Sequence, residues 1–475
     1  MEGQSRSLLR RAWILLFWNA SVAFLISSEF INLLVMSYKI WPGESFHALE
    51  MGGLITARLW VDGVAALFWG WLADRFNRRK LHIFNSAATG SLVLVNAFLP
   101  VGGGFSSYYT WLCVRMLIGA FMSGGGPLGN SLSSDLARSE EKSQYFGYSS
   151  ITWQVVQVGS MVLSAFMFST GELWRAFFVI SAGMFFSMTL FLGTCFKEPV
   201  RAGTHASFTK IIGDTKGVTY DFKLTWATIK DTMLRPTNIL AFSEGIFTSV
   251  LFGIIDLIWL PYIQSPPRNI SPTATSIFML VYAVPGAILG AYVFGKMSDK
   301  YGARRLRNRV LIIASSLLGS MVLILVAFFI PLPVLTEAEG ADIANLFSYP
   351  VFIVFGSLML VMRATFSIFA VNQPPILQEI NLPEAQGRVA SLGQLVEIFS
   401  YGSGPLLAGA VLVAFGQDYQ AAIQVVALIA LPGITMWFLA IKWVEKDQAR
   451  VKRIVEARAR ALKDKSGNQA ISRDQ

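Results

Sequence analysis

The residues of this sequence best placed to do chemistry are ionisable side chains inside long apolar stretches. A charged group at the centre of a bilayer costs roughly 3 kcal/mol or more, so it needs a partner, water or a ligand. Glu29 and Asp256 are two such carboxylates, and Asn32 lies one turn beyond Glu29 on the same helical face. Because burial disfavours a charged carboxylate, both acids are predicted to carry a proton or hold a charged group.

Basic residues with the same placement supply possible partners. Arg58 and Asp62 are four residues apart in one apolar run, so they share a helical face and can pair. A pair that only neutralises itself explains this spacing as well as a functional pair does. Arg115 and Arg363 lie in two other apolar runs and are predicted, with Glu29, to line a polar cavity.

Two polar stripes at helical spacing occupy equivalent places in the two halves of the chain. The first contains Gln154 and Gln157, and the second contains Gln394, Glu397 and Tyr401. Polar contacts between neighbouring helices would account for such stripes. Their symmetry favours a binding site, and Glu397 is the most specific candidate for a proton carrier. Glu244 and Asn238, nearer one end of a later run, are expected to be gate or cap residues.

A short basic loop occurs twice, about 225 residues apart, each time between two apolar runs. The first copy contains Gly70, Asp74, Arg75, Arg78 and Arg79. The second contains Gly295, Asp299, Arg304 and Arg305. Asn77 and Gly302 hold equivalent places, and both residue types tolerate the left-handed backbone of a tight turn. An internal repeat at this distance indicates two related halves.

The elements that must position these residues are membrane helices. Apolar residues make up 54% of the chain and charged residues 14%, against about a quarter in soluble domains. Runs long enough to cross a bilayer are predicted at 12–36, 50–73, 80–101, 107–130, 144–168, 173–195, 238–263, 272–297, 309–331, 347–372, 387–415 and 419–443. We therefore predict an all-α integral membrane protein with twelve transmembrane helices in two pseudo-symmetric bundles.

The polar interruptions divide the chain into four parts. An N-terminal bundle at 1–196, a linker at 197–237, a C-terminal bundle at 238–443 and a basic tail at 444–475 are expected. The tail carries a loose apolar stripe that includes Val451 and Val455, which suits either a solvated helix or one resting on anionic lipid.

The net charge of +10 reflects topology rather than nucleic-acid binding. Basic residues concentrate in alternate loops, which predicts that both termini are cytoplasmic. Cys113 and Cys195 lie in apolar runs, and the three histidines show no metal-ligand spacing. No phosphate-binding loop or nucleophile–base pair is present, so neither an enzyme, a cofactor nor a metal is expected.

Twelve spans in two halves, with the G-x-x-x-D-(R/K)-x-(G/N)-x-R pattern after spans 2 and 8, resemble the major facilitator superfamily. The pattern Arg115-x-x-x-Gly119 is similar to that family's second motif. The order Arg115, Gly119, Pro127 and Asp135, followed by Trp174-Arg175-x-x-Phe178, resembles the Spinster-type lysolipid carriers within it.

The resemblance implies that spans 1, 4, 7 and 10 line a central cavity and that Asp74 lies against the start of span 11. A carboxylate there would meet the positive end of a helix, so the repeated loops are predicted to form a cytoplasmic latch. The alternative is a topology signal that only anchors the loops.

The function predicted is secondary active transport of an amphiphilic or organic-ion small molecule by alternating access, coupled to protons. A lipid-like uniporter of the Spinster type and a non-transporting sensor with a carrier fold are the alternatives. The expected partners are the substrate, protons and membrane lipids. We expect a monomer in the plasma membrane.

Overall fold

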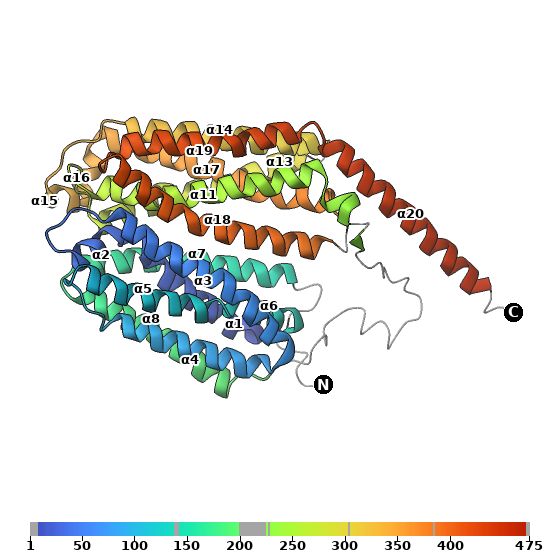
Figure 1. The fold of residues 1–475 in the computed structure, drawn as a ribbon, viewed down its shortest axis with the longest axis horizontal. Helices are drawn as coiled ribbons and strands as arrows, with labels where there is room; N and C mark the ends of the chain where they lie inside the picture. The colour runs from blue at the N-terminus through green and yellow to red at the C-terminus, as the bar shows by residue number, and fades with distance from the viewer. Residues whose placement is uncertain are drawn as a thin grey trace.

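The molecule is a bundle of long helices that run side by side (Figure 1). The structure is a computed structural model and describes residues 8–136, 142–198, 225–226, 229–302, 305–382 and 385–471, without a few of the side chains in these ranges. Apolar side chains of the helices form one continuous core. All described regular structure is helical.

The first half of the chain forms one group of helices, blue to green in Figure 1. They are α1 (Leu8–Ile31), α2 (Leu33–Ile40), α3 (Ala48–Arg75), α4 (Arg78–Asn96), α5 (Phe105–Met122), α6 (Gly125–Leu136), α7 (Lys142–Ser169) and α8 (Leu173–Thr194). The predicted first span is α1 with α2, and the predicted fourth span is α5 with α6.

The second half forms the other group, yellow-green to red. Its elements are η1 (Ile229–Met233), α11 (Pro236–Gln264), α12 (Pro272–Leu289), η2 (Gly290–Phe294), α13 (Gly295–Gly302), α14 (Leu306–Phe329), α15 (Glu337–Ala341), α16 (Ile343–Ser348), α17 (Pro350–Glu379), α18 (Gln386–Ala414), α19 (Tyr419–Ala440) and α20 (Val444–Ile471). The predicted eighth span is α12, η2 and α13 in succession.

Among the described residues, 11 helices are long and apolar enough to cross a membrane. The third predicted span, α4, is not one of them because its first turns carry Arg78, Arg79, Lys80 and His82 and its inward face is polar, with Asn85, Ser86, Thr89 and Asn96 fully buried. This face packs against α5 and α8. The all-helical, multi-span membrane fold is therefore confirmed.

The two ends of the bundle differ. We call the end at which α3 leads into α4 the repeat end, since both repeated loops lie there, and the opposite end, near α2 and α15, the far end (Figure 1). The tail helix α20 begins at the repeat end and extends away from the bundle.

The two halves meet along α3 and α18, the most extensively packed pair of helices. A Cβ on Gly52 would collide with the carbonyl oxygen of Pro405. Near the far end, the side-chain amide of Gln264 donates to the carbonyl oxygen of Ile31 over 3.1 Å. The halves are thus in contact from the middle of the molecule to the far end.

The tail helix does not stand free where it starts. The Asp447 carboxylate accepts from Thr237 Oγ1 at 2.6 Å and from the Thr237 backbone N–H at 3.1 Å, so α20 caps the first turn of α11. Val451 packs with Leu382 and Val389 in a small core of its own. The first part of the apolar stripe is thereby covered by protein.

Candidate functional site

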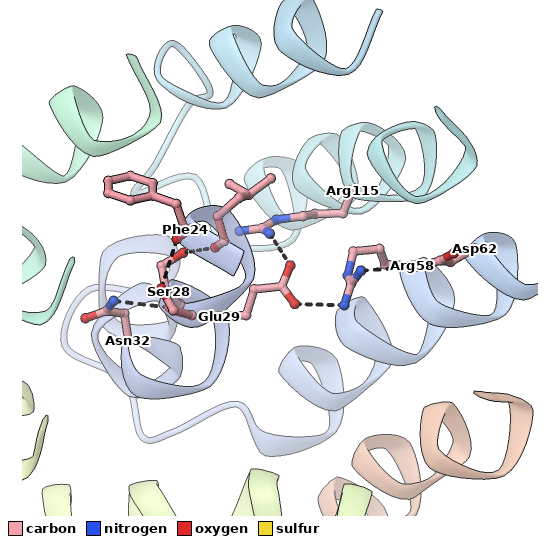
Figure 2. Close-up of polar contacts among 9 residues, drawn as sticks. Phe24, Ser28, Glu29, Asn32, Arg58, Asp62 and Arg115 are labelled. Atoms are coloured by element: carbon pink, nitrogen blue, oxygen red, sulfur yellow. Dashed lines mark hydrogen bonds and ion pairs between the residues drawn. The ribbon is translucent and has the colours of Figure 1, made fainter. Parts of the chain in front are cut away.

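A buried network of charges lies in the first half. The Glu29 carboxylate pairs with two arginines: Oε1 is 2.8 Å from Nη1 of Arg115, and Oε2 is 2.9 Å from Nη2 of Arg58. Arg58 Nη1 is also 3.8 Å from Oδ2 of Asp62. Figure 2 shows this chain of contacts, which we call the N-half cluster. The predicted Arg58–Asp62 pairing is present, but it is the longest contact of the network.

Three helices position the N-half cluster. Glu29 lies in the last turn of α1, Arg58 lies in α3 and Arg115 lies in α5. A Cβ on Gly119, one turn after Arg115, would come within 2.6 Å of the Arg58 carbonyl oxygen. The missing side chain therefore lets α5 approach α3 closely enough for both arginines to reach the same carboxylate.

The N-half cluster is nearly dry except at Asp62, whose side chain is 25% exposed. The Glu29 side chain is 3% exposed and that of Arg58 is 4% exposed. Two acids balance two bases, so the cluster is neutral when all four groups are ionised, and protonating either acid leaves one positive charge. Beside it is an enclosed space of about 20 Å³, lined by Met36, Met51 and Trp111, which is enough for a water molecule.

Asn32 is not part of this cluster. Its side-chain amide donates to Ser28 O at 3.1 Å and to Ser164 Oγ at 3.2 Å, which ties the end of α1 to α7. In Figure 2 it points away from Glu29. Asn32 therefore makes no contact with the N-half cluster in the described structure, and its place in a transport cavity stays a prediction.

A second polar group lies in the other half. The Tyr401 hydroxyl on α18 donates to Oδ2 of Asp256 on α11 at 2.8 Å. Arg363 of α17 lines the same cavity, and its Nε has no hydrogen-bond partner. We call Asp256, Arg363 and Tyr401 the C-half cluster. Tyr401 also interacts electrostatically with Arg58 and Glu29, which places the two clusters within reach of one another.

The cavity beside the C-half cluster has a volume of about 330 Å³. Apart from the cluster and Ser367, its walls are apolar, with aromatic and aliphatic side chains mixed: Phe252, Ile255, Trp259, Leu260, Met279, Ala287, Met362 and Phe366. Phe252 and Phe366 meet edge to face at 4.9 Å. An apolar pocket with a few convergent polar groups is the usual form of a small-molecule site.

The two polar stripes are less closely arranged. Gln154 is exposed and donates to Ser150 on its own helix at 3.1 Å, while Gln157 is half-buried. Gln394 and Glu397 are exposed on α18, two turns and one turn before Tyr401 respectively. Tyr401 is thus the stripe residue that reaches a partner on another helix, and the pairing of the stripes across the halves stays a prediction.

The first repeated loop is anchored within its own half. Arg78 is buried, with its Nε 3.1 Å from Glu198 Oε1 and its Nη1 donating to the Ser131 carbonyl at 3.1 Å. Arg79 donates to the carbonyl oxygens of Leu192 and Gly193 at the end of α8. Arg75 stacks on Trp71 at 4.3 Å.

The other residues predicted to form the two repeated loops are only partly described by the structure. A Cβ built on Gly70 would lie 4.0 Å from the Cβ of Pro127. Gly295 is the first residue of α13. The side chains of Asp74 and Asp299 and all of Arg304 lie outside the described residues, whereas Arg305 is the exposed N-cap of α14. The left-handed turn expected at Asn77 is wrong: its φ is −67°, and its side chain accepts from Lys80 N as the N-cap of α4.

Glu244 and Asn238, the predicted gate or cap residues, lie in the first turns of α11. Asn238 forms a reciprocal amide pair with Asn381, at 2.9 and 2.8 Å, between α11 and the residues after α17. Glu244 caps nothing, since it lies inside α11 and is fully buried. Within the described part of the chain, no group of three or more His, Cys, Asp or Glu side chains could hold a metal ion.

Comparison with known proteins agrees with this geometry. The model of the Major Facilitator Superfamily matches residues 16–375 and 237–475. A putative metabolite transport protein of Haemophilus influenzae is 24% identical over 264 residues, which cover 53% of this chain and 59% of that protein. The match therefore spans less than two thirds of the relative's length.

Solved structures share the fold. A bacterial homologue of the human lysosomal transporter Spinster, in an inward-facing and unoccupied conformation, aligns with a TM-score of 0.68 at 16% identity, covering 93% of this chain and 99% of that one. A D-xylose–proton symporter aligns with a TM-score of 0.62 at 13% identity, covering 90% and 97%. With its two bundles of spans and a family match across nearly its whole length, this integral membrane protein belongs to the Major Facilitator Superfamily of secondary transporters, which are not enzymes.

Proposed function

We propose that this transporter moves an amphiphilic or organic-ion molecule by alternating access and that its transport is coupled to protons. The observation that carries the proposal is the cavity of about 330 Å³, in which one acid and one base lie among apolar walls that include three aromatic side chains, Phe252, Trp259 and Phe366. A sugar site would need many hydrogen-bonding side chains, whereas this one offers few. The polar groups would bind the charged part of the substrate, and the aromatic groups its apolar part.

Glu29 suits a role in proton coupling because its partners control its protonation. Two arginines stabilise its charged form in the closed network. An anionic substrate group that competes for either arginine would weaken these ion pairs, and the buried carboxylate would then favour binding a proton. Substrate and proton would thereby bind together. Asp256 and Glu397 are the further candidates for proton transfer.

In this proposal the repeated loops form a latch on the cytoplasmic side of the membrane, and both termini lie on that side. The carrier acts as a monomer in the plasma membrane. Contacts between the halves reach the far end in this structure, and Arg78 and Arg79 bind groups of their own half. This is the arrangement expected when the latch is open and the cavity communicates with the cytoplasm.

The test is flux into proteoliposomes for a panel of organic anions, organic cations, amphiphiles and sugars, each with and without a pH gradient. We expect uphill flux of a charged or amphiphilic compound that collapses with the gradient, and Glu29→Gln and Glu397→Gln should uncouple it. Glu337→Gln, an exposed residue of α15, is the matched control. Uphill flux that survives collapse of the gradient would exclude proton coupling.

The apolar walls of the cavity favour one alternative, a uniporter for lysolipid or other lipid-like molecules. Such a carrier would equilibrate an amphiphile at a rate independent of pH gradient. A sensor with a carrier fold would bind a compound of the panel and show no flux. The same experiment therefore separates the three functions.

A further inference from the structure

Glu244 is a buried acid that the clusters described above do not use. It lies about two turns inside α11, and the residue is 0% exposed. One carboxyl oxygen, Oε1, shares a short hydrogen bond with the hydroxyl of Thr248, one turn further along the helix. The other, Oε2, has no hydrogen-bond partner.

Among the residues that the structure describes, no basic side chain acts electrostatically on this carboxyl group. The charged group that acts on it electrostatically is another acid, Glu397 of α18. On the α19 side it faces Trp437, whose indole N–H lies near the carboxyl group without completing a hydrogen bond. Gly433 of α19 packs on Phe247 beside it.

These surroundings favour a neutral acid over a carboxylate. A buried charge without a counter-charge is far more costly than a buried neutral group that keeps a hydrogen bond. We propose that Glu244 is a proton-storage site of the transport cycle, occupied at neutral pH in this conformation, and that it exchanges its proton with water through Glu397.

Contacts around Glu244 indicate on which side its proton can reach water. Toward the repeat end, α11 is covered by the Asn238–Asn381 amide pair and by Asp447, which caps its first turn. On the α18 side, Phe242 lies 3.5 Å from a Cβ built on Gly393, one turn before Glu397. Glu397 is exposed whereas Glu244 is fully buried, so we assign the exchange with water to Glu397.

This inference rests on the proposed function in one respect: it gives the coupling proton a location outside the substrate cavity. Glu397 would accept a proton from solvent and pass it to Glu244. No bond other than O–H is made or broken, and the charge on Glu397 returns to its starting value after each transfer.

Infrared spectroscopy of the purified protein in detergent at neutral pH tests the site without any substrate. A protonated carboxylic acid has a C=O stretching band separate from carboxylate bands. We expect Glu244→Gln to remove such a band, and Glu337→Gln, which alters an exposed acid of the far end, to leave it intact. An acid band unchanged by Glu244→Gln, or a carboxylate band lost instead, would overturn the proposal.

Transfer into D₂O tests the path. The acid band of the wild-type protein should shift as the proton is replaced by deuterium, and the shift should be slower in Glu397→Gln. Equal exchange in the two proteins would reject Glu397 as the route. The proposed function fails by a different result, namely uphill flux of the wild-type carrier that ignores the pH gradient.

Discussion

Glu29 is the single acceptor for two buried arginines, so its charge matters to the fold as well as to transport. In Glu29→Gln, Arg115 would lose its ion-pair partner in the described structure, and Arg58 would keep only the longer contact of 3.8 Å with Asp62. Removing one member of a buried ion network costs about 3–5 kcal/mol. Thermal unfolding in detergent should show a lower midpoint for this variant, and Glu337→Gln should match the wild type. An unchanged midpoint would mean that water already compensates the arginines.

Arg363 gives a prediction about selectivity. Its Nε is unpartnered beside the cavity, so it is available to a negative group of the substrate. A hydrogen bond to a charged group contributes about 1.5–3 kcal/mol, so Arg363→Gln should weaken binding of anionic panel members about 10- to 100-fold. Neutral compounds should bind as before.

Arg307→Gln, which changes an exposed arginine at the start of α14, is the control for Arg363→Gln. Equal losses for anions and neutral compounds would show that Arg363 shapes the cavity without binding charge. The measurement is the concentration dependence of initial flux for each compound.

For single residues, side-chain contacts within one helix could be predicted from the sequence. Contacts between residues far apart in the sequence could not. Arg58 and Asp62 are four residues apart, so helical geometry alone brought them together. Glu29 and Arg115 are 86 residues apart, and their contact depends on how α1, α3 and α5 pack. Asn77 was misjudged because an asparagine suits both a left-handed turn and a helix N-cap, and the following helix decided between them.

Among the elements, the close approach of α3 and α5 depends on Gly119. Gly119→Ala would place a methyl group 2.6 Å from the Arg58 carbonyl oxygen and force the helices apart. Overpacking of this kind costs about 1–3 kcal/mol, and the shifted Arg115 should also slow transport. Gly183→Ala in α8, where a Cβ meets nothing within 4 Å, should be neutral or stabilising. Normal unfolding and flux in Gly119→Ala would contradict this role.

The contact between α20 and α11 makes a prediction of its own. Asp447 supplies the N-terminal cap that α11 lacks in its own sequence, since Arg235 makes no side-chain cap. Loss of such a cap costs about 1 kcal/mol, so Asp447→Ala should lower the unfolding midpoint. It should also make the tail more sensitive to limited proteolysis. Unaltered cleavage would show that Val451 and its neighbours hold α20 in place without Asp447.

Helix positions were predictable within a few residues because a span needs a long apolar run. The breaks inside two spans could not be predicted. The first span is interrupted where α1 ends at Ile31, and the eighth contains the π-helical turn η2 just before Gly295. Gly290, in η2, explains this second irregularity in part, because a Cβ there would collide with the Ala364 carbonyl of α17. Such close approaches depend on the partner helix and leave little trace in the sequence.

For the whole molecule, the contact between α3 and α18 predicts how the two halves separate. Gly52→Ala would push Pro405 away, and the same displacement should loosen the contact near Thr56, whose hydroxyl accepts from Leu406 N at 3.2 Å. A cysteine at Thr56, in a protein without Cys113 and Cys195, should therefore react faster with a water-soluble maleimide when Gly52→Ala is added.

Gly129→Ala in α6, where a Cβ meets nothing within 4 Å, is the control for that measurement. Equal labelling of Thr56→Cys with and without Gly52→Ala would show that the contact between α3 and α18 tolerates the extra carbon and does not limit separation of the two halves.

The two-part architecture could be predicted from the repeated loops and the family resemblance, whereas the conformation could not. The proposed alternating access needs at least two arrangements of the same halves, and their relative stability would depend on the sum of many contacts, including those between α3 and α18. The resemblance implied a central cavity lined by spans 1, 4, 7 and 10, whereas the residues around the cavity of about 330 Å³ come from α11, α12, α17 and α18. Nor did it indicate that Asp256 and Arg363 share this cavity with Tyr401.

The polar inner face of α4 bears on how the protein is made. A helix that buries Asn85, Ser86, Thr89 and Asn96 is poorly soluble in lipid by itself. During synthesis it emerges before α5 and α8, the helices that later cover those groups. Its stable insertion must therefore await them, and truncated chains that stop before α8 should leave this segment on the wrong side of the membrane or at its surface.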